Sequence, residues 1–182
     1  MQIAILQVGS TELNILSEVE KRLSKAFPHL TFRVLEEMMS IPLDTYDSKR
    51  KQFNSSRILA KINVFSKKMG LEHVLGITDV DLFVPYLNFV FGEAEYNGRA
   101  AIISVFRLRP EFYGRDSDRN LLVERSVKEA IHELGHTLGL GHCNNPNCVM
   151  FFSNSIDDTD SKGILLCEKC KSFTMSQSSF ER

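Results

Sequence analysis

The sequence has no large excess of charge of either sign. Its 182 residues include 22 lysines and arginines against 23 aspartates and glutamates, which leaves a formal net charge of −1. A chain with this balance lacks the general positive field that attracts a polyanion. We therefore expect no nucleic-acid partner.

Long apolar runs are also missing. No stretch approaches the roughly 18 apolar residues that a membrane-spanning helix requires. Residues 1–8 are apolar, but they lack the basic region, the long apolar core and the small-residue cleavage site of a signal peptide. We expect a cytoplasmic protein with no membrane partner.

Cysteine is absent from most of the chain, since all four cysteines lie in the last quarter: Cys143, Cys148, Cys167 and Cys170. In a reducing compartment, thiols are more often metal ligands or free groups than disulfides. The spacing C-x4-C followed by C-x2-C suits a closed tetrahedral site of four thiolates. We predict a structural zinc ion there; disulfides and partly buried free thiols are the alternatives.

Length and composition favour one folded domain. Hydrophobic residues make up 43% of the chain and charged residues 25%, as in an ordinary soluble protein. A chain of this length can bury one substantial core. We expect a single domain over residues 1–182, with an N-terminal subdomain at 1–138 and a small C-terminal subdomain at 139–182, in a monomer.

Apolar patterning along the first two thirds predicts an α/β fold. Helical spacing marks two helices, one following Thr11 as a capping residue and one ending at Gly70. Strand patterns alternate with them, and Asn97-Gly98 signals a hairpin between the last two. The expected strands cover 2–8, 31–36, part of 74–84, 88–95 and 100–106. This order predicts a mostly parallel, twisted five-stranded sheet with one antiparallel strand at an edge.

A third helix is expected from about Asp118 to Leu138. Its apolar residues fall on one side and its two histidines on the other, so one face can pack on the sheet while the other faces a cleft. From Gly139 onward neither helix nor strand is evident. We expect an irregular segment held together by the four-cysteine zinc site, with poor order from Ser172.

The segment from His132 to His142 reads HExxHxxGxxH. Residues four apart stack on one helix face, so His132 and His136 can share one zinc ion. A third ligand six residues later would overshoot the ion on a continuing helix. Gly139 tolerates the left-handed conformation that ends a helix, and so lets His142 return to the metal.

Three neutral histidines leave one coordination position open for water, whose pKa zinc lowers to about 7. Glu133 follows the first ligand and can accept the proton of that water as it attacks a carbonyl. This chemistry is peptide-bond hydrolysis. We therefore predict two zinc ions per chain, one catalytic and one structural.

The assembled motifs resemble those of the archaemetzincins, a branch of the metzincin zinc peptidases. The matching pieces are HExxHxxGxxHC from His132, C-x4-C from Cys143, C-x-M ending at Met150, and the final CxxC ending at Cys170. The resemblance implies a metzincin fold in which Met150 forms an apolar floor beneath the catalytic zinc. It also implies that residues 88–95 form an edge strand that pairs with an extended peptide substrate.

A non-catalytic zinc module that binds a protein or nucleic-acid partner is the competing hypothesis. The carboxylate of Glu133 favours the peptidase, because binding alone does not require a base beside an open zinc. The residue that stabilises the transition state is left unassigned. Glu129, one turn before Glu133, either orients a ligand imidazole or is solvated.

Overall fold

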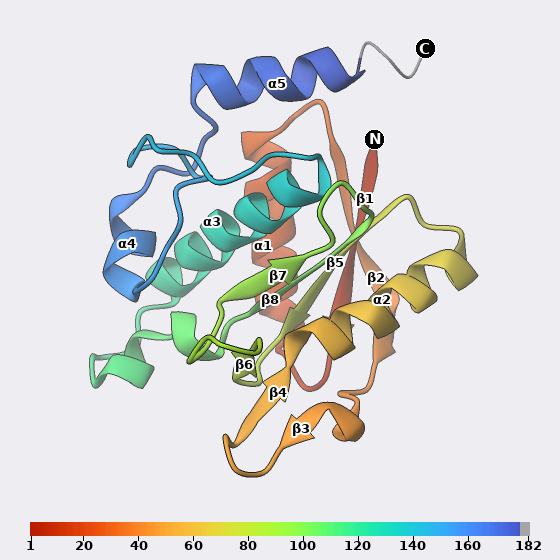
Figure 1. Ribbon diagram of the computed structural model, residues 1–182, viewed down its shortest axis with the longest axis vertical. Helices are drawn as coiled ribbons and strands as arrows, with labels where there is room; N and C mark the ends of the chain where they lie inside the picture. The colour runs from red at the N-terminus through yellow and green to blue at the C-terminus, as the bar shows by residue number, and fades with distance from the viewer. Residues whose placement is uncertain (179–182) are drawn as a thin grey trace.

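A five-stranded sheet forms the centre of the computed structural model, which describes residues 1–178 (Figure 1). The strand order is β2-β1-β5-β8-β7. β1 (Gln2–Val8) lies between β2 (Thr31–Met39) and β5 (His73–Thr78), β8 (Ala100–Ser104) follows β5, and all these neighbours are parallel. β7 (Gly92–Ala94) pairs antiparallel with β8 at the edge. The predicted mostly parallel sheet with one antiparallel edge strand is confirmed.

Helices cover both faces of this sheet. Alternate residues of β1 point to opposite sides, with Ile3 and Ile5 in one core and Ala4 and Leu6 in the other. The first core also contains α1 (Leu13–Ala26) and α3 (Arg119–Thr137), and the second contains α2 (Ser55–Met69). Because β1 is covered on both faces, its sequence is almost continuously apolar.

The helix ends agree with the sequence only in part. Gly70 closes α2 in a left-handed conformation, as predicted, and the Asn54 side chain caps its start by accepting from the Arg57 N–H. Thr11 does not cap α1, because the capping position is Glu12 and makes no side-chain bond. The hydroxyl of Thr11 instead donates to the carbonyls of Val8 and Ile77, tying the loop to β5.

The strands near the cleft are shorter than predicted. β5 ends at Thr78, and β6 (Leu82–Phe83) belongs to a separate three-stranded sheet with β3 (Tyr46–Asp47) and β4 (Gln52–Asn54). Residues 88–91 form only an isolated bridge, between Val90 and Leu82. The carbonyls of Leu87 and Asn88 accept from the Arg50 guanidinium. Short 3-10 turns lie at Leu43–Thr45, Phe106–Leu108 and Pro110–Tyr113.

The expectation of no helix after Gly139 is wrong. α4 (Ile156–Ser161) begins at a capping box in which Ser155 and Asp158 bond each other reciprocally. α5 (Glu168–Ser178) starts beside the last two cysteines, so the serine-rich tail is helical from Ser172 to Ser178, and its remainder lies outside the described residues. α4 is too short and α5 too polar for apolar periodicity to reveal them.

Within residues 1–178, no helix combines the length and apolar character needed to cross a membrane.

Candidate active site

Three histidines converge at the C-terminal end of α3. His132 and His136 lie one turn apart, and their Nε2 atoms are 3.1 Å from each other. His142 comes back to the same place, so one ring nitrogen from each imidazole lies within 4.8 Å of the others. The HExxHxxGxxH spacing predicts that these three side chains meet, and they lie close together in the structure.

The end of α3 produces the return of His142. Gly139 has a φ of 82°, and its N–H donates to the carbonyl of His136. The N–H of Leu140 donates back to Gly135, completing a Schellman arrangement that satisfies two of the last carbonyls of the helix. The chain therefore leaves the helix sideways and carries His142 toward the other two rings.

Backbone carbonyls orient the helical imidazoles. Nδ1 of His132 lies 2.9 Å from the Val149 oxygen, and Nδ1 of His136 lies 2.7 Å from the Leu140 oxygen. A carbonyl can only accept, so each Nδ1 carries the proton and each Nε2 turns a lone pair to the centre. Two lone pairs this close repel unless a cation lies between them. A tetrahedral zinc with bonds of 2.0 to 2.1 Å would space two nitrogens about 3.3 Å apart, so the donor set fits that ion.

The pKa values of all three imidazoles are lowered, which favours the neutral form that binds a metal. Burial lowers the pKa of His132 to about 2, with the Lys162 ammonium adding to the effect. Burial is also the largest cause of the lowered pKa of His136 and of His142. No proton therefore competes for the Nε2 atoms near neutral pH.

Glu133 is buried between α3 and the edge strand. A Cβ added to Gly92 would lie 2.7 Å from Cγ of Glu133, so β7 passes directly over this carboxyl group. Burial raises its pKa well above the usual value, the Glu129 carboxylate adds to the rise, and Lys162 opposes it. The same burial makes the carboxylate a stronger base.

Glu129 neither orients a ligand imidazole nor faces solvent, the two roles expected from the sequence. It is buried, its Oε1 lies 2.9 Å from Nζ of the fully buried Lys162, and it accepts a bond from the Thr159 hydroxyl. Since carbonyls orient His132 and His136, Glu129 is not their hydrogen-bond partner. From the sequence, Lys162 is expected to offset the charge of the cysteine cluster or to be solvated, and its pairing with Glu129 is not predicted.

Met150 lies beneath the end of α3. Its side chain is fully buried, and its sulfur would be 2.4 Å from a Cβ placed on Gly135. Gly135 thus lets the methionine approach the helix between the two histidine positions. The carbonyl of Met150 accepts from the N–H of Cys143, which joins this turn to the loop after His142.

The four cysteines form a second cluster beside the first. Their sulfurs all lie within 4.8 Å of one another, and the Cys143–Cys167 and Cys148–Cys170 sulfurs are 3.8 Å apart. All four thiols are free. A tetrahedron with zinc–sulfur distances of 2.3 Å has edges of about 3.8 Å, so this donor set also fits zinc.

Backbone bonds and burial change the pKa values of the cysteines in opposite directions. The backbone N–H of Cys170 lowers the pKa of Cys167 to about 7, while burial raises the pKa of both Cys148 and Cys170. The N–H groups of Asn145 and Cys167 donate to the sulfurs of Cys143 and Cys148. Such bonds stabilise the charged form that coordinates a metal.

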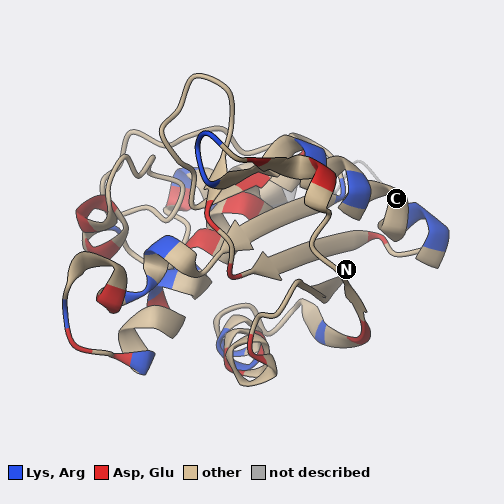
Figure 2. Ribbon diagram, turned by 90° about the horizontal axis from the view of Figure 1, so that it is seen from below, with Lys and Arg blue, Asp and Glu red and all other residues tan. Residues whose placement is uncertain are grey.

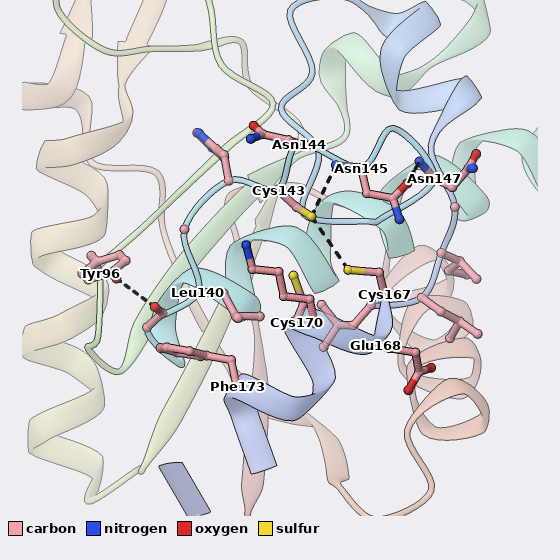
Figure 3. A pocket seen from close by; sticks show the side chains of 18 residues that line it. Tyr96, Leu140, Cys143, Asn144, Asn145, Asn147, Cys167, Glu168, Cys170 and Phe173 are labelled. Carbon is pink, nitrogen blue, oxygen red and sulfur yellow. Dashed lines mark hydrogen bonds between the residues drawn. The ribbon is translucent and has the colours of Figure 1, made fainter. Parts of the chain in front are cut away.

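Two hollows border the histidine cluster. The Phe152 hollow, about 180 Å³, lies between residues 87–92, residues 152–154 and the Glu129–Glu133 stretch of α3. A larger groove of about 1040 Å³, here the Leu165 groove, extends from His142 on the other side (Figure 3). Its apolar lining comes chiefly from Tyr96, Leu140, Ile164, Leu165, Leu166 and Phe173.

Comparison with known proteins gives concordant matches over nearly the whole chain. The model of peptidase family M54 matches residues 2–175. The archaemetzincin of Methanocaldococcus jannaschii is 45% identical over 170 residues, which cover 93% of this chain and 90% of that protein. The archaemetzincin of Pyrococcus furiosus is 40% identical over 172 residues, covering 92% and 89% respectively.

Solved structures are similar over the same extent. The archaemetzincin of Archaeoglobus fulgidus, crystallised with malonate, is 40% identical, with a TM-score of 0.82 and coverage of 95% of this chain and 99% of that one. A zinc-dependent peptidase of Methanocorpusculum labreanum is 31% identical, with a TM-score of 0.86 and coverage of 94% and 99%. The similarity therefore includes the sheet, α3 and the segment with the four cysteines.

Proposed function

Because this chain belongs to peptidase family M54, the archaemetzincins, and is a zinc-dependent metallopeptidase, we propose that His132, His136 and His142 bind its catalytic zinc and that Glu133 is the general base. One observation carries the assignment. Three imidazoles point their metal-binding nitrogens to one centre, and Glu133 lies beside it under the edge strand.

Bound zinc supplies a Lewis acid that polarises the scissile carbonyl and lowers the pKa of a water molecule. Glu133 accepts a proton from the attacking water and returns it to the departing amine. Val149 and Leu140 hold the two helical imidazoles in the required tautomer through their carbonyls. Gly92 leaves room for the Glu133 side chain, and Met150 closes the site from below as an apolar floor.

Cys143, Cys148, Cys167 and Cys170 are proposed to hold a second, structural zinc. Four thiolates fill a tetrahedral ion and leave no position for water. The site joins the loop after His142 to the start of α5, and through the Cys143 N–H it also supports the Met150 turn. The proposal is therefore two zinc ions per chain.

The proposed substrate is a peptide in extended conformation. β7 is paired with β8 on one side and forms the edge of the sheet on the other, and its Gly92 lies over Glu133. A peptide can add to this edge as a further strand and present a carbonyl beside Glu133. Extended chains fit such an edge better than the surface of a folded protein.

The same proposal includes a monomer of one domain, residues 1–182, with subdomains at 1–138 and 139–182, located in the cytoplasm. The four free thiols support a reducing compartment. Acidic and basic segments are interspersed in Figure 2, which supports a protein that does not bind nucleic acid. A purely zinc-binding module is not favoured, since the family consists of peptidases.

The test is mass spectrometry of a diverse peptide mixture incubated with zinc-loaded protein, beside a Glu133→Ala variant of equal zinc content. Cleavage by the parent protein and a loss of about 10² to 10⁴-fold in the variant is expected, the usual contribution of a general base. Equal cleavage by both proteins would exclude Glu133 as the base.

A further inference from the structure

The Leu165 groove has no part in the hydrolysis described above. Three large side chains that border it are well exposed: Tyr96 at 65%, Leu165 at 48% and Phe173 at 41%. Figure 3 shows the side chains of Leu140 and Phe173 close to Cys170 among the residues that line the groove. Soluble monomers rarely leave a concave apolar surface of this extent uncovered unless it binds something.

The groove is continuous with the proposed active site. His142 lines it directly. Tyr96 follows the edge strand by two residues and anchors its end, because its hydroxyl donates to the carbonyl of Gly139 and the next N–H, of Asn97, donates to His136. A peptide that pairs with β7 and extends as far as Tyr96 would therefore lie over the Leu165 groove.

The Phe152 hollow, Glu133 and the Leu165 groove follow one another along the edge strand. The Phe152 hollow lies at its beginning, where residues 87–92 form one wall. Gly92 lies over Glu133, and Tyr96 lies at the Leu165 groove. At about 3.3 Å per residue, the four steps from Gly92 to Tyr96 span at most about 13 Å, because β7 ends at Ala94 and Tyr96 lies in the turn that follows. A substrate residue in the groove is thus three or four positions from the scissile bond.

We infer that the Leu165 groove is a substrate subsite that binds large apolar side chains, such as leucine or phenylalanine, three or four residues before the scissile bond. Antiparallel pairing is the more stable kind, and it places the amino end of the peptide over Tyr96. The segment that carries the four cysteines thereby forms a wall for substrate. This inference rests on the proposed function and adds a substrate class to it.

The test uses peptides that share one cleaved bond and differ only at the third and fourth positions before it, with leucine, phenylalanine or glycine there. For the zinc-loaded parent we expect kcat/KM about tenfold higher with leucine than with glycine, the effect of burying one such side chain. Leu165→Ser and Phe173→Ser should each reduce this ratio to about threefold or less. Val64→Ser replaces an exposed apolar side chain on α2 that does not line the groove, and it should keep the parent ratio.

Binding gives a second readout without turnover. In a Glu133→Ala background, fluorescence anisotropy should show the leucine peptide binding about tenfold more tightly than the glycine peptide, and Leu165→Ser should reduce this difference to about threefold or less. Thermal melting and zinc content of every variant establish that the fold is intact.

Three results would overturn the subsite. Cleavage with no apolar preference before the bond, or with a preference that Leu165→Ser and Phe173→Ser leave unchanged, removes it while the proposed function stands. A parent that sediments as a dimer and becomes a monomer on Leu165→Ser shows that a second copy covers the groove. Absence of any cleavage by the parent overturns the proposed function and the subsite with it.

Discussion

Glycine at two positions decides how closely backbone and side chains approach in the active site. Gly92 and Gly135 both have φ angles that any residue could adopt, so their role is steric. A Cβ at either position would meet a side chain that the proposed mechanism uses, namely Glu133 or Met150.

Gly92→Ala should reduce kcat/KM by about 10²-fold, because misplacing a catalytic group by an ångström has an effect of that order. The new methyl group would lie 2.7 Å from Cγ of Glu133 and 2.7 Å from the Ile102 carbonyl, and the backbone cannot move away without breaking β7–β8 pairing. Steady-state kinetics on a cleaved peptide checks this. Unchanged zinc content serves as the control, and full activity would contradict the geometry.

Gly135→Ala should lower the free energy of unfolding by about 1 to 3 kcal/mol, the usual cost of overpacking a core. The added carbon would lie 2.4 Å from the Met150 sulfur. In a double-mutant cycle with Met150→Ala, the two changes should be less destabilising together than the sum of the single effects, because the clash is gone. Strict additivity in urea unfolding would show that the two residues do not touch.

At the scale of elements, buried ion pairs attach α3 to α4 and the residue after it. The guanidinium of the fully buried Arg125 forms two bonds of 2.6 Å to Asp160, and the Lys162 ammonium lies 2.9 Å from Glu129. These contacts hold the C-terminal segment against the helix that carries His132 and His136. Local sequence patterns signal none of them.

Lys162→Met should destabilise the protein by about 3 to 5 kcal/mol, because it leaves Glu129 buried and unpaired. Adding Glu129→Gln should recover a large part of this loss, since the amide needs no counter-charge. Urea unfolding of both variants and of Glu129→Gln alone measures the effect. Equal stability of the Lys162→Met single and Lys162→Met, Glu129→Gln double variants would show that the charge of Glu129 is not the cause.

For the whole molecule, we expect activity to depend on the zinc of the histidine cluster and folding of the C-terminal segment to depend on the zinc of the cysteine cluster. His136→Ala should remove one of two zinc ions and abolish cleavage with little change in stability. Cys167→Ser should remove the other and unfold much of residues 139–178, because a structural zinc contributes folding free energy directly. Elemental analysis with circular dichroism tests both, and a single zinc ion in the parent protein would refute the four-cysteine site.

Much of the site could be predicted because its residues are neighbours in sequence. Helical spacing places His132 beside His136, Gly139 ends the helix in the left-handed conformation, and the cysteine spacings suit one tetrahedral ion. The order of apolar segments likewise predicted the sheet and its antiparallel edge, since parallel strands need helical crossovers and a hairpin does not. These are local rules that one chain segment obeys by itself.

Only the tertiary structure decided the rest. Several contacts join segments distant in sequence: the approach of Gly92 to Glu133, the pairing of Lys162 with Glu129, and the bonds from Arg50 to the carbonyls of Leu87 and Asn88. The Leu165 groove combines the end of the edge strand with α5, a helix too polar to show periodicity. Such contacts depend on how the elements pack together, and the residue pattern of one helix or strand does not identify the elements that it packs against.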